Sequence, residues 1–223
     1  MPASNRNRFS ANHLVIGILR QMRSVIVKVG GSLLTLSDLP DRLRKLINSI
    51  AADRVMLLAG GGPATDLVRD WDGIHELGAE VSHWLAIDSM SLTARLLSKL
   101  LPDAELVTDR TSANDLSLSS QTVILDPLPI IEEASKDAGP ALPLGWDCTS
   151  DSVAAWIAGR WNAHSLVLAK SVDMPEGDVA FGQRQTPAID RCFRSVHVSE
   201  LPVYWCNIRS RPELVELWKS GHT

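Results

Sequence analysis

The chain has 223 residues, of which 45% are apolar and 22% charged, and this composition is ordinary for a soluble globular protein. A net charge of −4 gives no general attraction for nucleic acid or for an anionic membrane, so neither is expected as a partner. The three cysteines, Cys148, Cys192 and Cys206, lie far apart. This spacing argues against a disulfide framework or a zinc site and favours a reducing, cytoplasmic compartment.

Residues 1–21 differ from the rest of the chain. Ser4–Asn12 is polar and rich in arginine and asparagine, and the apolar run Leu14–Leu19 contains only six residues. A run of this length is too short for a signal-peptide core or a membrane span. We therefore expect a flexible or artefactual extension, followed by a single domain over residues 22–223.

The first half of this domain predicts strands that alternate with helices. Val25–Val29 is β-branched and apolar except for one lysine, which is typical of a buried strand. Apolar residues at helical spacing predict a helix over 39–50. Val55–Ala59 is a second buried strand, and Pro63 then opens a helix that runs to about Leu77. A long helix is expected from Val81 to Leu100.

The second half continues the same pattern. Val123–Leu125, Leu166–Ala169 and Val203–Ile208 are expected as strands, and the segment 146–159 as a loop followed by a helix. Residues 210–218 predict a terminal helix, because Ser210 and Pro212 are suited to its first turn. Strands alternating with helices indicate an α/β fold with a mainly parallel central sheet that helices flank on both faces.

Two lysines stand at the ends of predicted buried strands. An unpaired ammonium group is costly to bury, and open α/β sheets bind ligands at the carboxyl ends of their strands. Lys28 could therefore meet a phosphate group across Gly30-Gly31, which follow it. Lys170 directly follows a later strand and precedes Ser171-Val172-Asp173. For each lysine alone, a solvated side chain at a strand end is an equally good explanation.

Three consecutive glycines, Gly60–Gly62, separate a buried strand from a helix. Their N–H groups and the helix N-terminus behind them attract an anion, although neither a Walker A loop nor a dinucleotide fingerprint is present. Asp151 in the first turn of a helix is explained by capping, but its carboxylate could also hold lysine ammonium groups in place. His83 and Trp84 on the long helix are more typical of core side chains than of a ligand site.

Three motifs occur in a specific order: VKVGGSLL (27–34), LLAGGGPATD (57–66) and TSDSVAA (149–155). Together they resemble the amino acid kinase superfamily, which includes aspartokinases, acetylglutamate kinases, uridylate kinases and isopentenyl phosphate kinases. The resemblance covers about residues 24–210. Further segments are similar to small aspartokinase-like kinases typified by the methanofuran-pathway phosphate kinase. These segments are SHWLAIDSM (82–90), LPLGWDCTSDSVAAWIA (142–158) and LPVYWCNIR (201–209).

The resemblance implies roles for individual residues. Lys28 touches the transferring phosphoryl group, Asp151 orients the lysines, and paired glycines line the channel between donor and acceptor. The acceptor and phosphate contacts are assigned to Gly30, Gly31, Gly60, Gly61 and Gly62, and the nucleotide contacts to Ser32, Lys170, Ser171 and Asp173. No residue is assigned as a metal ligand. The segment KSVDMPEG (170–177) departs from the T-D-V-D-G-like run of the superfamily, so the base and ribose contacts do not follow from the resemblance.

The implied activity is transfer of the γ-phosphoryl group of MgATP to a small-molecule acceptor. An acceptor lobe over 22–135 and a nucleotide lobe over 136–223 are expected. A phosphate monoester, as in the synthesis of a methanofuran-like one-carbon carrier, is the expected acceptor. An amino acid carboxylate is the alternative, and a non-catalytic nucleotide-binding protein on the same scaffold is another. The superfamily commonly dimerises, so a homodimer is a possible assembly.

Overall fold

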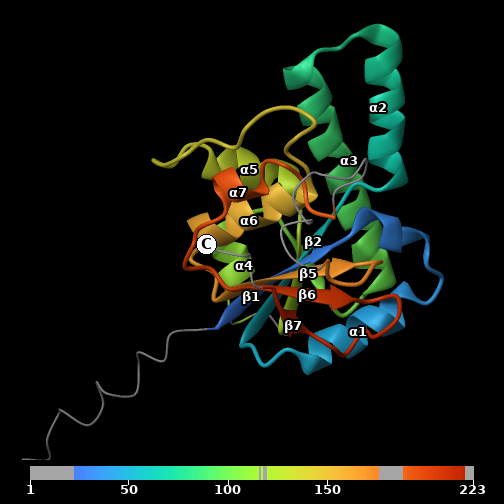
Figure 1. Ribbon diagram of the computed structural model, residues 1–223. Coiled ribbons are helices and arrows are strands. Elements are labelled where there is room, and N and C mark those ends of the chain that lie inside the picture. The colour runs from blue at the N-terminus through green and yellow to red at the C-terminus, as the bar shows by residue number, and fades with distance from the viewer. Residues whose placement is uncertain (1–22, 116, 118–119, 176–187, 219–223) are drawn as a thin grey trace, which may run out of the picture.

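A seven-stranded sheet forms the centre of the computed structural model, which describes residues 23–115, 117, 120–175 and 188–218 (Figure 1). The strand order is β3-β4-β2-β1-β5-β6-β7, and every neighbouring pair is parallel except β6 and β7. The strands are β1 (Ser24–Val29), β2 (Arg54–Ala59), β3 (Glu105–Val107), β4 (Thr122–Leu125), β5 (Ser165–Lys170), β6 (Val203–Asn207) and β7 (Glu216–Leu217). The predicted α/β fold is confirmed, whereas the expected extension over 1–21 lies outside the described residues.

Helices cover both faces of the sheet. In Figure 1, α1 lies on one face, α5, α6 and α7 lie on the other, and α2 and the start of α3 project beyond the sheet. The α-helices are α1 (Leu39–Ser49), α2 (Pro63–His75), α3 (Ala79–Leu100), α4 (Arg110–Asn114), α5 (Pro127–Ala134), α6 (Ser150–Arg160) and α7 (Phe193–Val196), and a 3-10 helix, η2, spans Gly31–Thr35. None of the described helices has the length and apolar character needed to cross a membrane.

The alternation of side chains along β1 decides which face Lys28 occupies. Val25, Val27 and Val29 belong to the core under α1, whereas Ile26 belongs to the core under α6. Because successive side chains of a strand point to opposite faces, Lys28 lies on the α6 face. All six residues of β1 are buried, as expected for a central parallel strand.

The same alternation places Lys170. In β5, Leu166 and Leu168 belong to the core under α6, so Lys170, two residues further on, points to that face as well. Lys28 pairs in register with Leu168 of the neighbouring strand. The two ammonium groups therefore reach one end of the sheet from adjacent strands.

The predicted terminal helix over 210–218 is wrong. In its place the chain forms a turn and then β7, which pairs antiparallel with β6 through Tyr204 and Leu217. The backbone N–H of Trp218 donates to the carbonyl of Val203, and the Trp218 ring packs edge-on against Phe193. These contacts complete the sheet edge, and they outweigh the local preference for a helix.

Candidate active site

Two glycine turns meet at the carboxyl ends of β1 and β2. The N–H of Gly60 donates to the carbonyl of Val29, and the N–H of Gly30 donates to the carbonyl of Ala169 in β5. A Cβ atom on Gly31 would lie 2.4 Å from the backbone nitrogen of Gly62, where φ is also positive at 55°. The two turns thus touch backbone to backbone, and only glycine allows this approach.

The middle glycine of the second turn packs against two hydroxyl groups. A Cβ atom on Gly61 would overlap Thr65 Oγ1 at 1.8 Å, and Thr65 and Ser89 form a hydrogen bond of 2.5 Å next to it. Among the described residues, no oxygen accepts a hydrogen bond from the N–H of Gly61 or Gly62. Free N–H groups at the start of α2 are suited to binding an anion.

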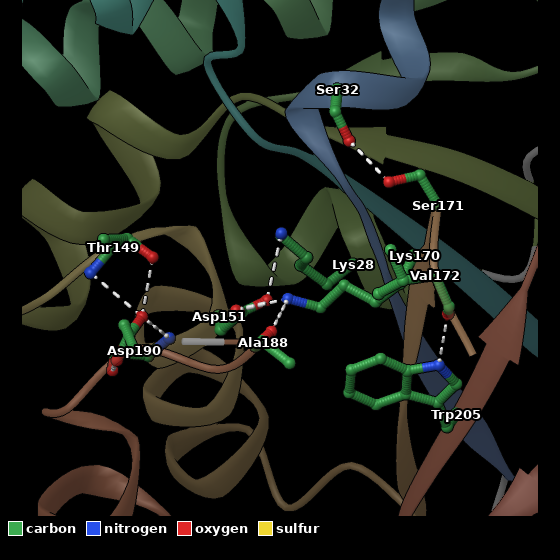
Figure 2. Close-up of polar contacts among 11 residues, drawn as sticks. Lys28, Ser32, Thr149, Asp151, Lys170, Ser171, Val172, Ala188, Asp190 and Trp205 are labelled. Atoms are coloured by element: carbon green, nitrogen blue, oxygen red, sulfur yellow. Dashed lines mark hydrogen bonds and ion pairs between the residues drawn. The ribbon is translucent and has the colours of Figure 1, made fainter. Parts of the chain in front are cut away.

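Lys28, Asp151 and Lys170 form a buried charge cluster on the α6 face of the sheet. Figure 2 shows both ammonium groups pointing at the Asp151 carboxylate. Lys28 Nζ lies 2.9 Å from Oδ1, and Lys170 Nζ lies 2.5 Å from Oδ2. Lys170 also donates to the carbonyl of Ala188 at 2.8 Å and lies over the ring of Trp205. The carboxylate predicted as a possible anchor for lysines occupies that position.

The cluster carries more positive than negative charge. Burial raises the pKa of Asp151, but the ammonium groups of Lys170 and Lys28 outweigh this effect and hold the pKa below its usual range. Burial lowers the pKa of Lys170 to about 8, and the negative charge of Asp151 limits the fall. One carboxylate cannot neutralise two ammonium groups, so an anion that binds beside them is favoured.

Asp190 is a member of the site that sequence reasoning missed. Its Oδ2 accepts hydrogen bonds from Thr149 N at 3.0 Å, Thr149 Oγ1 at 2.7 Å and Ser152 N at 3.1 Å. These donors include the free N–H groups at the start of α6, the helix that carries Asp151. Burial, and then the negative charge of Asp151, raise the pKa of Asp190. Asp190 lies outside any periodic segment, so the sequence contains no signal for this contact.

The residues assigned to the nucleotide are not all in one place. Ser32 and Ser171 meet through a hydrogen bond of 3.1 Å between their hydroxyl groups (Figure 2), while Lys170 belongs to the charge cluster. Asp173 instead accepts a hydrogen bond from Asn207 Nδ2 at 2.8 Å and lies on the exposed surface. Positions 176–177 of the unusual segment lie outside the described residues. The nucleotide contacts therefore stay a prediction.

A cavity of about 530 Å³ opens beside the glycine turns. Its walls are the two turns, the first part of α2, one side of α3 and the loop before α6. The Arg69 guanidinium stacks on the Trp146 ring, 4.9 Å from its centroid, and Trp146 Nε1 donates to Asp72 at 2.7 Å. The lining also includes Arg209, an exposed cation two residues beyond the end of β6.

The described part of the chain contains no group of three or more His, Cys, Asp or Glu side chains that could hold a metal ion. Burial raises the pKa of the Cys206 thiol to about 12, and it raises the pKa of Cys148 even further. Both thiols stay protonated and unreactive at neutral pH. The groups that the structure brings together at the strand ends are lysines, an aspartate and backbone N–H groups.

A parallel sheet thus brings two lysines, a shared aspartate and two glycine turns to one end of an α/β protein. The chain matches the model of the amino acid kinase family over residues 23–174, and it belongs to that family. The predicted superfamily is thereby confirmed. A search of curated protein sequences gave no match.

Solved structures of three uridylate kinases are similar to the chain. The enzyme from Archaeoglobus fulgidus is 25% identical, with a TM-score of 0.54 over 85% of this chain and 92% of that one. The UMP kinases from Ureaplasma parvum and Bacillus anthracis are each 14% identical with TM-scores of 0.53, covering 86% and 90% of this chain and 92% and 100% of theirs. For the two UMP kinases that are 14% identical in sequence, the likeness concerns the fold alone. Together with the family, these neighbours support a small-molecule kinase.

Gly31→Ala tests the contact between the two glycine turns. The added Cβ would lie 2.4 Å from Gly62 N and 2.6 Å from Gly62 Cα, so backbone must move. We expect the free energy of unfolding, measured in urea, to fall by about 1–3 kcal/mol. Gly73→Ala is the matched control, because its Cβ on α2 meets nothing within 4 Å. Because Gly73 lies within a helix, this substitution should raise the free energy of unfolding by up to about 1 kcal/mol. An equal change in the two variants would contradict the close contact between the glycine turns.

The pKa of Lys170 can be measured by NMR titration of labelled lysine side chains. One lysine should titrate near pH 8, and its signal should be missing in Lys170→Arg. Asp151→Asn should lower this pKa further, because the carboxylate favours the charged lysine. Between pH 8 and the ordinary lysine pKa of 10.5, the unfolded chain binds more protons, so this group's contribution to stability rises with pH. Titration of every lysine near 10.5 would contradict the described burial.

Proposed function

We propose that the protein is an ATP-dependent small-molecule kinase of the cytoplasm, which transfers the γ-phosphoryl group of MgATP to an acceptor in the cavity. The observation that carries this proposal is the Lys28–Asp151–Lys170 cluster at the strand ends, beside two glycine turns with free N–H groups. The sheet order supports an acceptor lobe over 22–135 and a nucleotide lobe over 136–223. Strands of the first range form one side of the sheet, strands of the second form the other, and they meet between β1 and β5.

The mechanism follows from what phosphoryl transfer requires. Its loose transition state needs in-line placement and neutralisation of charge on the transferring group. Among the described residues, Lys28 is paired with Asp151 alone, so its other N–H donors are available to that group. The N–H groups of Gly61 and Gly62 donate from the acceptor side. Magnesium would enter with ATP as part of the substrate, where it would offset the negative charge of the phosphates.

Asp151 acts as the positioning carboxylate in this mechanism. It fixes both ammonium groups before substrate binds, so little reorganisation is needed during the reaction. Asp190 in turn holds the N-terminus of α6 and thereby the Asp151 backbone. On the donor side we assign Lys170, Ser171 and Ser32 to the ATP phosphates, with Asp173 as a more distant nucleotide contact.

The proposed acceptor is a phosphate monoester, as in the synthesis of a methanofuran-like one-carbon carrier. Three segments carry the finer resemblance. Of these, 82–90 and 142–158 supply one side of α3 and the loop before α6, and 201–209 supplies Arg209 to the cavity lining. The uridylate kinase of Archaeoglobus fulgidus is named for an acceptor that is itself a phosphate monoester, which favours the same class here. An amino acid carboxylate is the second candidate, since related kinases in the superfamily use one.

Lys28→Ala tests the proposed chemistry directly. Removing a charge aimed at the transferring group should lower ATP-dependent turnover by about 10²–10³-fold, with the fold retained because Asp151 keeps Lys170 as a partner. Turnover is measured as ADP formation over a panel that begins with phosphorylated primary alcohols. Lys45→Ala on the exposed side of α1 is the control and should match the wild type. Wild-type turnover by Lys28→Ala would rule out this mechanism.

The same panel separates the kinase from the non-catalytic alternative. The departure of the segment 170–177 from the superfamily pattern motivates that alternative. Binding of MgATP in calorimetry, with no ADP formed with any acceptor, would favour a nucleotide-binding protein without turnover. ADP formation that depends on one acceptor would exclude it.

We further propose that two copies pair through the projecting helices α2 and α3. Large apolar side chains on these helices are between 44% and 69% exposed: Leu67, Trp71, Ile74, Val81, Leu92 and Leu96. A second copy presents the same stripe, so an isologous contact would cover both. Asp88 and Arg95 are exposed on either side of Leu92. Antiparallel pairing of two α3 helices about Leu92 would place these opposite charges against each other.

Leu92→Glu tests the proposed dimer. A charge at the centre of the pairing helices should convert a dimer to a monomer in size-exclusion chromatography with light scattering. Leu214→Glu is the control, because Leu214 is also exposed but lies outside α2 and α3. A wild-type protein that is monomeric at micromolar concentration would contradict the proposal.

A further inference from the structure

The proposed mechanism gives no role to Arg209, a cation in the lining of the cavity. This residue is exposed and lies in the turn that follows β6. Its guanidinium has no hydrogen-bond or ion-pair partner among the described residues, and the contacts that Arg209 makes are those of its backbone. An exposed arginine needs no protein partner, so the position at which the chain holds this one decides what it can bind.

The backbone of the turn is fixed on both sides of Arg209. Arg42 of α1 donates from Nη1 to the carbonyl of Ile208 at 3.2 Å and to the carbonyl of Arg209 at 2.5 Å. The side-chain oxygen of Asn207 accepts from the N–H of Arg209 at 3.1 Å and from the N–H of Ser210 at 3.3 Å. Because both backbone polar groups of Arg209 are engaged, the polar group that it can present to the cavity is its guanidinium.

Arg209 lies where the donor and acceptor sides of the proposed site meet. On the donor side, the N–H of Ile208 donates to the carbonyl of Lys170 at 3.0 Å, so the turn lies directly beside the end of β5. On the acceptor side, Arg209 lines the same cavity as the two glycine turns. In a kinase, the group that lies between donor and acceptor is the terminal phosphate of the donor.

The carboxylates beside this turn are paired with other arginines. Asp173 lies 3.7 Å from Arg211 Nη2, and Asp38 lies 2.7 Å from Arg42 Nη2. In the part of the chain that the structure describes, no carboxylate lies within ion-pair distance of Arg209. A free guanidinium has five N–H donors in a planar fork, which matches the oxygens of a phosphate group. The ligand that this arrangement favours is therefore a phosphate.

We propose that the guanidinium of Arg209 binds the terminal phosphate of the nucleoside triphosphate donor. Two parallel N–H groups of the fork donate to its oxygens, while Lys28 and the glycine N–H groups hold the same phosphate from the ends of β1 and β2. This inference rests on the proposed function in taking the cavity as the acceptor site and the end of β5 as the donor side. It makes Arg209 the residue that distinguishes a triphosphate from a diphosphate.

Calorimetry with a non-hydrolysable ATP analogue and with ADP, each with magnesium, tests this assignment without turnover. Arg209→Ala should bind the analogue about 10-fold or more weakly than the wild type, because hydrogen bonds to a charged group are lost. Its binding of ADP should be unchanged, since ADP lacks the terminal phosphate. Arg44→Ala is the matched control, because Arg44 is an exposed arginine that pairs with Asp41 on α1 and does not line this cavity. This variant should bind both ligands as the wild type does.

Two further measurements separate a ligand contact from a structural role and identify the source of the phosphate. Arg209→Lys keeps the charge but not the fork, so it should restore part of the analogue binding. Urea unfolding should be the same for both Arg209 variants and the wild type, because the backbone holds the turn. Benzyl phosphate, which carries only an acceptor-like phosphate, should bind equally to the wild type and to Arg209→Ala.

The outcomes distinguish this inference from the proposed function. Unchanged analogue binding by Arg209→Ala, an equal loss for the analogue and ADP, or a loss confined to benzyl phosphate would overturn the inference. If the wild type still formed ADP with an acceptor, the kinase would stand in each of these cases. Analogue binding that depends on Arg209, without ADP formation on any acceptor, would support the inference and count against the kinase. A wild type that does not bind the analogue would overturn both.

Discussion

The structure depends on one carboxylate that is shared by two buried ammonium groups. Asp151 lies within ion-pair distance of Lys28 and Lys170. Lys28 and Asp151 are each only 4% exposed. Neither lysine could occupy a strand end in the core without this partner, because an unpaired buried charge is expensive. Asp151 engages only one side of the Lys28 ammonium group, and the N–H donors that it leaves unpaired suit the end of the sheet to an anion.

The rest of the fold holds the three side chains of this cluster in place. The alternation along β1 and β5 sends both lysines to the face covered by α6, and Asp190 binds the free N–H groups at the start of that helix. On the other side of the strand ends, the contact between Gly31 and Gly62 brings free N–H groups next to the cluster. Ammonium groups and peptide dipoles from different elements are thus fixed at one end of the sheet.

Those parts of the fold that repeat a strong local pattern could be predicted from the sequence. The buried strands around Lys28 and Lys170 are continuous apolar runs, and the glycine turns stand directly after such runs, so the fold and the lysines were both accessible. Residues 210–218 were predicted wrongly, because pairing with β6 outweighs the helix signals. Asp190 could not be found, since its role depends on contacts between segments distant in the chain.

The central claim is that Lys28 and the N–H groups of the glycine turns receive the transferring phosphoryl group at the strand ends. A crystal structure with magnesium and a non-hydrolysable ATP analogue is the most direct measurement. The account predicts that the terminal phosphate accepts hydrogen bonds from Lys28 Nζ and from the N–H groups of the glycine turns, with the Asp151 contacts to both lysines preserved. A terminal phosphate bound elsewhere, with Lys28 still turned only to Asp151, would contradict it.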